Sequence, residues 1–456
     1  MKKLSQTDIK SATAAVTCSF IFGILMGTPR LSSLLFVASM TRFGVDRQRA
    51  SFPFFLCYTI RNASGPLIGY LGGKFGLKNV IILGCLLSSI AVGGCFFAED
   101  IVTITILWGV AFGFSFGLGV ALLPQVLSLH FSSHLDKAVG VNVGGECIAS
   151  FLLTLLTEFL LKTYGLSGTF LILSGVVLHS IPAAMLIQIP NQKTGQNEES
   201  SNESDLKSDL VDQNEKSVLF SGKLELKTNR HEFNGNKVSA TTSSAKQKLD
   251  PKSSLYGFRV FLNPTYILIL LTQSTMMYIF TSTNTILVDV SRDHDVSISD
   301  AVYVLIGFQV ADAVGRFTLG FVTDRGYLSK ANFSAVCFVA IGLLLVAFIW
   351  IRGFAGMMIF VLGLGVFIGG LKMISASFVM QYVEKDCFSI AIASRFLLYP
   401  PISFTQAPLI GFFRDKLQTY NGLFCILIAI CCVNSIVSLM VPSMERCRQK
   451  RKKCSQ

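Results

Sequence analysis

The feature that most constrains this chain is a series of long apolar stretches, each long enough to cross a lipid bilayer. A helix needs about 20 mostly apolar residues to span the hydrocarbon core. The sequence therefore predicts an all-α polytopic membrane protein with twelve transmembrane helices. The twelve stretches lie at residues 12–40, 51–72, 79–98, 102–129, 138–162, 168–189, 264–289, 300–323, 331–351, 354–383, 388–412 and 420–442.

The composition agrees with this class. Of 456 residues, 51% are hydrophobic and only 14% are charged, whereas a soluble domain carries about 25% charged residues. An ordinary soluble enzyme is thereby excluded, and so is disorder over most of the chain. The net charge of +12 is not accompanied by a basic face with interleaved aromatic residues, so we expect a lipid bilayer and no nucleic acid as partner.

One segment departs from the apolar pattern. From about Asn191 to Pro251 the chain is rich in Asn, Ser, Lys, Glu and Asp, a composition that cannot bury enough apolar area to fold alone. We interpret it as a disordered cytoplasmic linker between two six-helix bundles. The predicted parts are residues 1–190 (first bundle), 191–260 (linker), 261–443 (second bundle) and 444–456 (basic cytoplasmic tail).

Positive charge in the short loops predicts the orientation. If both termini are cytoplasmic and the linker is left out, the inner segments hold 15 Lys and Arg residues and the outer segments hold 8. The first apolar stretch contains Pro29-Arg30 and lacks a small-residue cleavage site, so we expect it to be a mature span and not a signal peptide. The cysteines have no metal spacing and are expected to be unpaired thiols.

Two loops repeat between the predicted halves. Gly69-Tyr-Leu-Gly-Gly-Lys74-Phe-Gly76 follows the second span, and Gly320-Phe-Val-Thr-Asp324-Arg325-Gly326 follows the eighth. Both resemble the Gly-x-x-x-Asp-Arg-x-Gly loop of the major facilitator superfamily, whose plan is two related six-helix halves around a midplane site. The resemblance implies the major facilitator fold, with Lys74, Asp324 and Arg325 in conformational latch loops. The first loop has Gly73 where Asp is usual.

Ionisable residues within the spans are the candidate functional residues, because a charge at mid-bilayer costs about 2.5–3.5 kcal/mol on insertion scales. The deepest are Arg30, Arg61, Asp312, Arg316 and Lys372. Two further residues, Glu146 and Arg395, lie nearer the cytoplasmic helix ends and are expected to reach toward the interface. Together these seven residues comprise five cations and two acids, so an anionic ligand, water or backbone must complete the balance.

Asp312 and Arg316 are four residues apart on one helical face, where an acid preceding a base pairs well. The pair is either a static link between helices or a proton switch in which protonated Asp312 releases Arg316 for a carboxylate. Arg30 is a second candidate anchor. It cannot relay a proton because Arg stays charged in proteins, so proton coupling falls mainly on Asp312. Arg61 and Lys372 are either substrate contacts or structural partners.

Several ordered motifs resemble the monocarboxylate porter family. They include the Asp-x-x-x-Arg pair in Leu287–Arg325, the stretch from Phe388 through Ala407-Pro408 to Asp415, the stretch Lys137-Ala-Val-Gly140 with Gly144, and Pro29-Arg30 in the first span. The departures are Ser11-Ala-Thr-Ala-Ala-Val at the opening of span one, His134-Leu135 in the fifth-span signature, and Gln406 where Gly is expected. They mark a divergent member and weaken an assignment of lactate or pyruvate.

The resemblance implies a proton-coupled or facilitative carrier of small monocarboxylates in the plasma membrane, working by alternating access. It also implies a single-span accessory glycoprotein as a candidate partner. Arg30, Arg316, Lys372 and Arg61 would contact the substrate and Asp312 would couple the proton, with no cofactor other than the proton and no metal.

Two alternatives remain open. The first is a facilitator of neutral or zwitterionic solutes, such as aromatic amino acids or compounds like thyroid hormone, in which the Asp312–Arg316 pair stays ionised. The second is a transporter-like receptor that does not transport. An enzyme is not expected, because the five histidines show neither metal spacing nor a partnered nucleophile.

Overall fold

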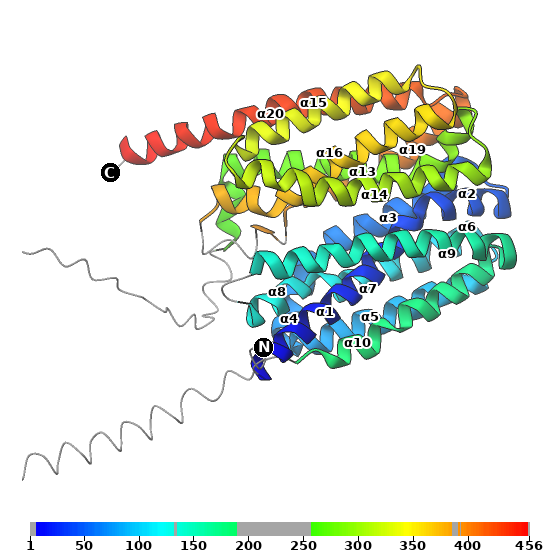
Figure 1. The fold of residues 1–456 in the computed structure, drawn as a ribbon, viewed down its shortest axis with the longest axis horizontal. Coiled ribbons are helices and arrows are strands. Elements are labelled where there is room, and N and C mark those ends of the chain that lie inside the picture. Colours follow the sequence, from blue (N-terminus) through cyan, green and yellow to red (C-terminus); the bar gives the residue numbers. More distant parts are fainter. Residues whose placement is uncertain (1–5, 132–134, 189–256, 385–390, 393, 455–456) are drawn as a thin grey trace, which may run out of the picture. The chain divides into compact units, whose positions relative to one another are not determined.

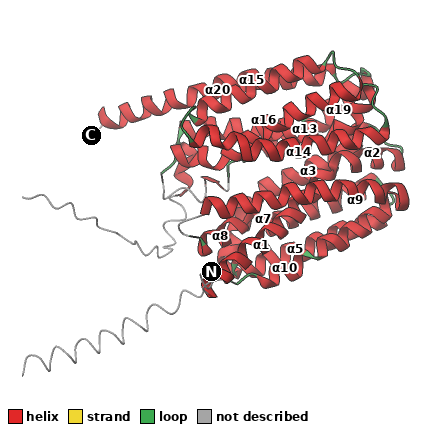
Figure 2. Ribbon diagram, in the orientation of Figure 1, coloured by secondary structure: helices red, strands yellow, loops and turns green. Residues whose placement is uncertain are grey.

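The computed structural model describes residues 6–131, 135–188, 257–384, 391–392 and 394–454. All regular elements within these residues are helical (Figure 2), which confirms the all-α prediction. Met1–Gln188 and Lys252–Gln456 together form one compact unit. The predicted linker falls outside the described residues except at its end, where η4 (Gly257–Leu262) is a short 3-10 helix.

The first half of the chain folds as a group of helices, drawn from blue to green in Figure 1. Each predicted span from one to six coincides with one or more of its elements. These are α1 (Gln6–Gly27), η1 (Thr28–Leu31), α2 (Ser32–Phe43), α3 (Arg47–Ala63), α4 (Gly65–Phe75), α5 (Leu77–Gly94), η2 (Cys95–Phe97), α6 (Ile101–Ile104), η3 (Thr105–Phe112), α7 (Gly113–Ala121), α8 (Leu123–His130), α9 (Leu135–Leu178) and α10 (Ser180–Leu186).

The second half forms a corresponding group, drawn from green to red in Figure 1. Its last helix, α20, runs without interruption from predicted span twelve into the predicted basic tail, so the described tail residues are helical. The elements after η4 are α13 (Pro264–Asp293), α14 (Ile298–Asp324), α15 (Lys330–Phe348), α16 (Gly353–Tyr382), α18 (Tyr399–Ser403), α19 (Gln406–Ile410), η6 (Gly411–Lys416) and α20 (Asn421–Cys454).

Eight helical segments of the described residues are long and apolar enough to cross a membrane. One of them, Gly140–Leu186, contains predicted spans five and six, and Gly165 turns the chain between them with φ +64°. Predicted spans two, seven and eleven are not among the eight segments. Span eleven falls partly outside the described residues, whereas spans two and seven are helical but carry many polar side chains.

The helix α13 explains why span seven is not strongly apolar. Its polar run Thr281-Ser-Thr-Asn-Thr285 is at most 4% exposed, because the helix packs against α2, α14, α16 and α20. A helix surrounded by other helices does not have to match lipid on its surface, so hydroxyl and amide groups can face the protein interior. The polar residues of this predicted span therefore face neighbouring helices and not lipid.

Proline breaks the first span at mid-length. Pro29 lacks an N–H and fixes its φ angle, and the chain passes there from α1 through the single turn of η1 into α2. This break places Arg30 in the turn, where its backbone carbonyl accepts a hydrogen bond from Asn284 Nδ2 at 3.3 Å. A discontinuous helix of this kind is a common way to build a polar site inside a transporter.

Two close helix approaches bring the charged residues together. A Cβ atom at Gly369 of α16 would lie 2.2 Å from the Asp312 carbonyl oxygen, and one at Gly145 of α9 would lie 2.3 Å from the Ser19 carbonyl oxygen of α1. Small residues let helices in lipid approach until backbones touch. The α14–α16 contact thereby sets Asp312 beside α16, and the α1–α9 contact sets α9 beside the broken first span.

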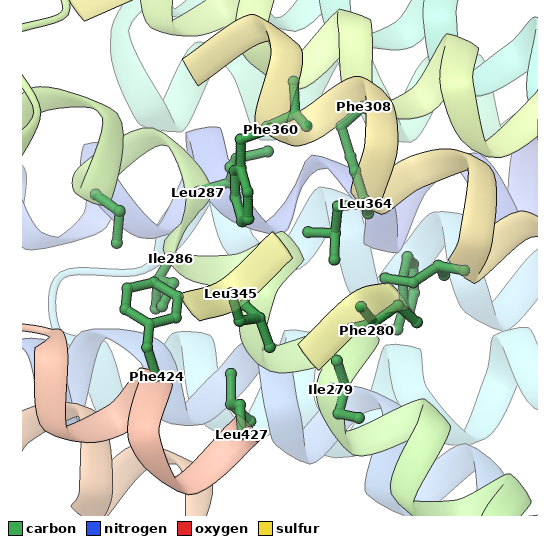
Figure 3. Close-up of a cluster of buried hydrophobic side chains, with 14 of the residues drawn as sticks. Ile279, Phe280, Ile286, Leu287, Phe308, Leu345, Phe360, Leu364, Phe424 and Leu427 are labelled. Atoms are coloured by element: carbon green, nitrogen blue, oxygen red, sulfur yellow. The ribbon is translucent and has the colours of Figure 1, made fainter. Parts of the chain in front are cut away.

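The apolar core has a main cluster in each half. The second-half cluster is built largely from α13, α14, α15, α16 and α20, and it includes Phe280, Phe308, Leu364 and Phe424 (Figure 3). Leu34, Phe55 and Tyr58 of the first half also belong to this cluster. The two halves therefore share apolar packing as well as polar contacts.

Candidate functional site

A group of five charged side chains joins the two halves inside the helical bundle. Arg30 and Glu146 come from the first half, and Asp312, Arg316 and Lys372 from the second. We call these five residues the central cluster. Four of their side chains are at most 5% exposed, and the Lys372 side chain is 16% exposed.

Arg30 contacts an acid from each half. Its Nε atom lies 2.8 Å from Glu146 Oε1, and its Nη2 atom donates to Asp312 Oδ2. The guanidinium carbon lies 5.4 Å from the centre of the Phe280 ring, a distance at which a cation is attracted to an aromatic face. The prediction that Arg30 is an interior cation of the site is consistent with this position.

Glu146 occupies a position that the sequence interpretation missed. It was expected to extend to the cytoplasmic interface, but it is 4% exposed and pairs with two arginines. Oε2 accepts from Arg316 Nη1 at 2.8 Å, and Oε1 accepts from Arg316 Nη2 at 3.2 Å and lies beside Arg30. The expectation was wrong because depth was judged from the predicted end of one span, whereas partners on other helices decide where a carboxylate settles.

Asp312 and Arg316 form the pair that their spacing predicts. Arg316 Nη2 donates to Asp312 Oδ2 at 2.9 Å across one turn of α14. The pair is not isolated, because Asp312 also contacts Arg30 and Lys372 and Arg316 also contacts Glu146. A two-residue switch is thus part of a five-residue network.

Lys372 completes the cluster from α16. Its Nζ lies 3.4 Å from Asp312 Oδ1 and 3.3 Å from the centre of the Phe280 ring. The distance to Asp312 is that of an ion pair, but the geometry is not that of a hydrogen bond, and both atoms lack a hydrogen-bond partner among the described residues. We therefore treat the contact as electrostatic attraction that leaves the ammonium donors free.

The central cluster carries three cations and two acids, so its formal charge is +1. Each cation also has a buried donor atom that meets no acceptor among the described residues: Arg30 Nη1, Arg316 Nε and Lys372 Nζ. Buried polar atoms are nearly always hydrogen-bonded. An excess positive charge with free donors on all three cations is the arrangement expected of a site for an anion.

Arg61, which the sequence placed among the substrate contacts, does not join the central cluster. Its guanidinium carbon lies 5.4 Å from the centre of the Phe116 ring, and Nη1 donates to Asn62 Oδ1 at 3.1 Å. Arg395 is half-buried and donates to the Ile392 carbonyl at 3.1 Å.

The predicted latch loops lie at the ends of α4 and α14. Lys74 is exposed in the last turn of α4, with its Nζ 5.5 Å from the Phe75 ring centre. Arg325 is exposed just after α14. The side chain of Asp324 is outside what the structure describes, so the latch role of this loop stays a prediction.

A second group of ion pairs joins the halves at the opposite end of the bundle from the two termini. We call this end the outer end, following the charge bias, and the group Arg47, Asp289, Asp415 and Tyr420 the outer latch. Arg47 Nε lies 2.8 Å from Asp289 Oδ2, Arg47 Nη1 lies 3.2 Å from Asp415 Oδ1, and the Tyr420 hydroxyl donates to Asp289 Oδ2 at 2.6 Å. From the sequence alone, Arg47 is only one of the loop charges that predict the orientation.

Further polar contacts tie the loops of the outer end together. Asp293 pairs with Arg414, and burial raises the pKa of the Asp293 carboxyl while Arg414 opposes that change. His294 Nδ1 lies 2.7 Å from the Ile351 carbonyl oxygen and 2.9 Å from Arg352 Nη1. Nδ1 cannot both donate and accept, and the shorter contact to a carbonyl requires that it donate. Burial lowers the pKa of His294 and the Arg352 charge lowers it further, although the hydrogen bond to Ile351 raises it.

The missed residues had weak signals in the sequence. Glu146 is an acid within an apolar stretch, and its spacing of four from Asn142 and Ser150 marks a polar face of α9. Asp289 lies at the end of a predicted span, where a charge is expected for topology alone. The long-range pairs across the halves had no local pattern, because their partners are more than 100 residues apart in the chain.

Comparisons with known proteins agree with the fold. Residues 12–399 match the family model described as Major Facilitator Superfamily. Monocarboxylate transporter 12-B of Danio rerio is 22% identical over 443 residues, which cover 93% of this chain and 86% of that protein. Monocarboxylate transporter 7 of Homo sapiens is 22% identical over 434 residues, with 90% and 82% covered.

Among solved structures, the peptide transporter POT in complex with sulfate has a similar fold, with a TM-score of 0.69 at 12% identity and with 97% of this chain and 99% of that chain covered. The chain therefore belongs to the Major Facilitator Superfamily, as a transporter related to the monocarboxylate transporters and not as an enzyme.

Proposed function

We propose that the protein carries small monocarboxylates or similar organic anions across the membrane by alternating access, coupled to protons through the buried acids of the central cluster. One observation supports this proposal above all. Three cations and two acids from both halves meet at one buried place, and each cation keeps a hydrogen-bond donor free. The relatives named monocarboxylate transporters support the same class of substrate.

The binding role falls on Arg30, Arg316 and Lys372. A guanidinium presents donors in a planar fork that matches a carboxylate, and a hydrogen bond to an ionised group is stronger than a neutral one. Because Arg30 and Arg316 come from different halves, an anion held by both touches each half. Arg61 stands apart from this cluster and would meet the substrate elsewhere on its path.

The coupling role falls on an acid, since an arginine does not release its proton in a protein. The sequence favours Asp312, which lies one turn from Arg316 and is fully buried. Protonation of an acid raises the net charge of the central cluster by one unit, which favours binding of an anion. Transport of one proton with one monocarboxylate would then move no net charge.

The outer latch fits an alternating cycle in the plasma membrane with both termini in the cytoplasm. Arg47 belongs to the first half, whereas Asp289, Asp415 and Tyr420 belong to the second. Opening the outer end requires these contacts to separate, and closing it restores them. An accessory single-span glycoprotein would bind outside this machinery, on lipid-facing helices.

A zwitterionic solute is the second candidate, and one observation favours it. Asp312 Oδ1 is buried and accepts no hydrogen bond from the described residues, so an ammonium group could take it while a carboxylate contacts the arginines. The net charge of +1 nevertheless favours an anion, because a zwitterion leaves that charge unbalanced. A transporter-like receptor would instead show no saturable flux of either class.

Uptake into proteoliposomes tests the proposal. The purified full-length chain is reconstituted, an inward proton gradient is imposed, and uptake of radiolabelled propionate, benzoate and an aromatic amino acid is followed. We expect saturable carboxylate uptake that the gradient drives above equilibrium. Lys372→Met keeps the apolar stem but removes one charge, so its KM for carboxylate should rise about tenfold, which corresponds to 1.4 kcal/mol. Amino-acid flux without carboxylate flux, or no gradient dependence, would contradict the proposal.

A further inference from the structure

Glu146 engages both arginines of the central cluster as a carboxylate ligand would. Its two oxygens contact Arg30 of the first half and Arg316 of the second, at 2.8 Å in each case. The same two guanidinium groups are those that the proposed function gives to the substrate carboxylate. Glu146 therefore holds the place that the substrate needs, and both cannot occupy it while Glu146 is ionised and paired.

Asp312 is much less free to leave its partners. It contacts three cations, Arg30, Arg316 and Lys372, and it is fully buried. Glu146 contacts only two of these cations, and its side chain is one methylene longer. Because each cation stabilises the ionised form of a neighbouring acid, Glu146 is the acid that protonation detaches more easily.

The helix that carries Glu146 also offers a place for the protonated form. Asn142 and Ser150 lie one turn before and one turn after it on α9, and residues at this spacing are neighbours on the helix surface. Asn142 Oδ1 and Ser150 Oγ are buried and lack a hydrogen-bond partner among the described residues. A carboxylic acid has an O–H to donate, whereas a carboxylate has none, so only protonated Glu146 can satisfy either of these oxygens as a donor.

Other charged and titratable groups face Glu146 from neighbouring elements. All of these groups influence the protonation of Glu146, and the cations among them outnumber the acid. They are Arg30 of η1, Asp312 and Arg316 of α14, Lys372 of α16, Tyr58 and Arg61 of α3, and the adjacent Cys147 of its own helix.

We propose that Glu146 is the proton-carrying group and that it alternates with the substrate carboxylate on Arg30 and Arg316. One proton from solvent binds Glu146, its two ion pairs break, and the neutral acid turns toward Asn142 or Ser150. The substrate carboxylate then pairs with both arginines. When the substrate leaves to the other side of the membrane, Glu146 gives its proton to the solvent on that side and pairs with both arginines again.

Charge is balanced at each end of this exchange. The cluster has a charge of +1 with Glu146 ionised, and it again has +1 with Glu146 protonated and a monoanion bound. A monocarboxylate therefore restores the charge of +1 that the cluster has with Glu146 ionised, whereas a dicarboxylate would change it to 0. This inference rests on the proposed function, and it moves the coupling role expected of Asp312 to Glu146, leaving Asp312 to hold the three cations in position.

Binding as a function of pH tests this assignment. The full-length chain in detergent is titrated with radiolabelled propionate and benzoate at several pH values. Uptake of one proton per anion predicts that the apparent Kd of the native chain rises about tenfold per pH unit over the range in which Glu146 titrates. Glu146→Gln mimics the protonated acid, so it should bind both probes with an affinity independent of pH. It should exchange substrate across the membrane but not accumulate it in a proton gradient.

Glu158→Gln is the matched control, because Glu158 lies on the same helix but pairs with the exposed Lys162. It should behave as the native chain. Asp312→Asn should lose probe binding, since Asp312 positions the cations. If Glu146→Gln does not fold, an infrared band of a protonated carboxylic acid that appears when benzoate binds to the native chain, and changes its frequency in Glu146→Asp, gives the same information.

The two proposals fail in different ways. If the native chain neither binds nor transports any carboxylate, the proposed function is wrong. If the native chain shows gradient-driven uptake and Glu146→Gln keeps it, the function stands and the assignment of Glu146 is overturned.

Discussion

The central cluster and the outer latch both join the two halves through arginine–carboxylate pairs, but their charges have opposite signs. The central cluster has three cations for two acids and is almost completely buried. In the outer latch one cation, Arg47, lies between the two acids Asp289 and Asp415, and the Arg47 and Asp415 side chains are 23% and 24% exposed. One group has an excess of positive charge in the membrane interior, and the other has an excess of negative charge near water.

This difference fits the proposed roles of the central cluster as a binding site and of the outer latch as a gate. A buried charge without a partner is costly, so the central cluster gains most when an anion restores its balance. Ion pairs that are partly exposed contribute about 0–1 kcal/mol and weaken as salt screens them. The outer latch is therefore weak enough to open in a transport cycle, and its negative charge does not compete for the anion.

The largest expected effect is a difference in stability between two substitutions in the central cluster, one that removes an acid and one that removes a cation. Asp312→Asn leaves three cations with one acid, so we expect it to lower the free energy of unfolding by about 3–5 kcal/mol, as for a broken buried pair. Lys372→Met leaves two cations with two acids and should change stability by less than about 1.5 kcal/mol, because the swap is close in volume.

Thermal unfolding in detergent, without added carboxylate, measures both variants. Equal losses of stability would show that the excess of cations in the central cluster has no energetic consequence. Addition of benzoate should raise the unfolding temperature of the native chain and have a smaller effect on Lys372→Met.

In the outer latch, removal of the cation should weaken the contacts more than removal of an acid, and the difference should be smaller than in the central cluster. Arg47→Gln leaves two neighbouring acids without their shared cation, whereas Asp415→Asn leaves a balanced pair. We expect Arg47→Gln to weaken closure by about 1 kcal/mol at low salt and Asp415→Asn to weaken it by less.

Hydrogen–deuterium exchange of residues 32–46 and 284–293 reports on this closure. Faster exchange in Arg47→Gln than in Asp415→Asn, with a difference that shrinks at high salt, is the expected result. The same exchange rate in both variants would show that the sign of the charge does not distinguish the latch from the central cluster.

The smallest expected effect concerns pH at the outer end. The folded protein lowers the pKa of His294, so neutral His294 stabilises the fold above the unfolded pKa of about 6.5, and this contribution is lost as pH falls through the folded pKa. His294→Asn keeps a donor for the Ile351 carbonyl but cannot take up a proton. The drop in unfolding temperature between pH 7 and pH 5 should therefore be smaller in the variant. If the unfolding temperature drops equally in the native chain and in the variant, other groups cause the sensitivity to acid.

Local patterns predicted most of the architecture. Apolar length located the spans, Pro29 marked the break in the first span, and the spacing of Asp312 and Arg316 gave their pair correctly. These features depend on contacts within one helix or on lipid as the common environment, so they leave a signal in neighbouring residues. Lys372 and Arg30 were found as interior charges because a charge within an apolar stretch is conspicuous.

The partners of these residues could not be predicted in the same way. Position along the spans predicts Glu146 at the interface, groups Arg61 with the site although it stands apart, and gives no sign of the contacts that Asp289 makes. In each case the deciding contact comes from another helix far along the chain. A residue's distance from the end of its own span does not say which helix packs beside it.

The two six-helix halves that span the membrane, and the excess of cations over acids within the spans, follow from the amino-acid sequence, because lipid imposes length and polarity on each segment separately. Which charges meet depends on how the helices pack. The close approaches at Gly145 and Gly369 bring α1 to α9 and α14 to α16, and the sum of charges at a site exists only after such packing. That sum, +1 at the centre and −1 at the outer latch, is what distinguishes the central cluster from the outer latch.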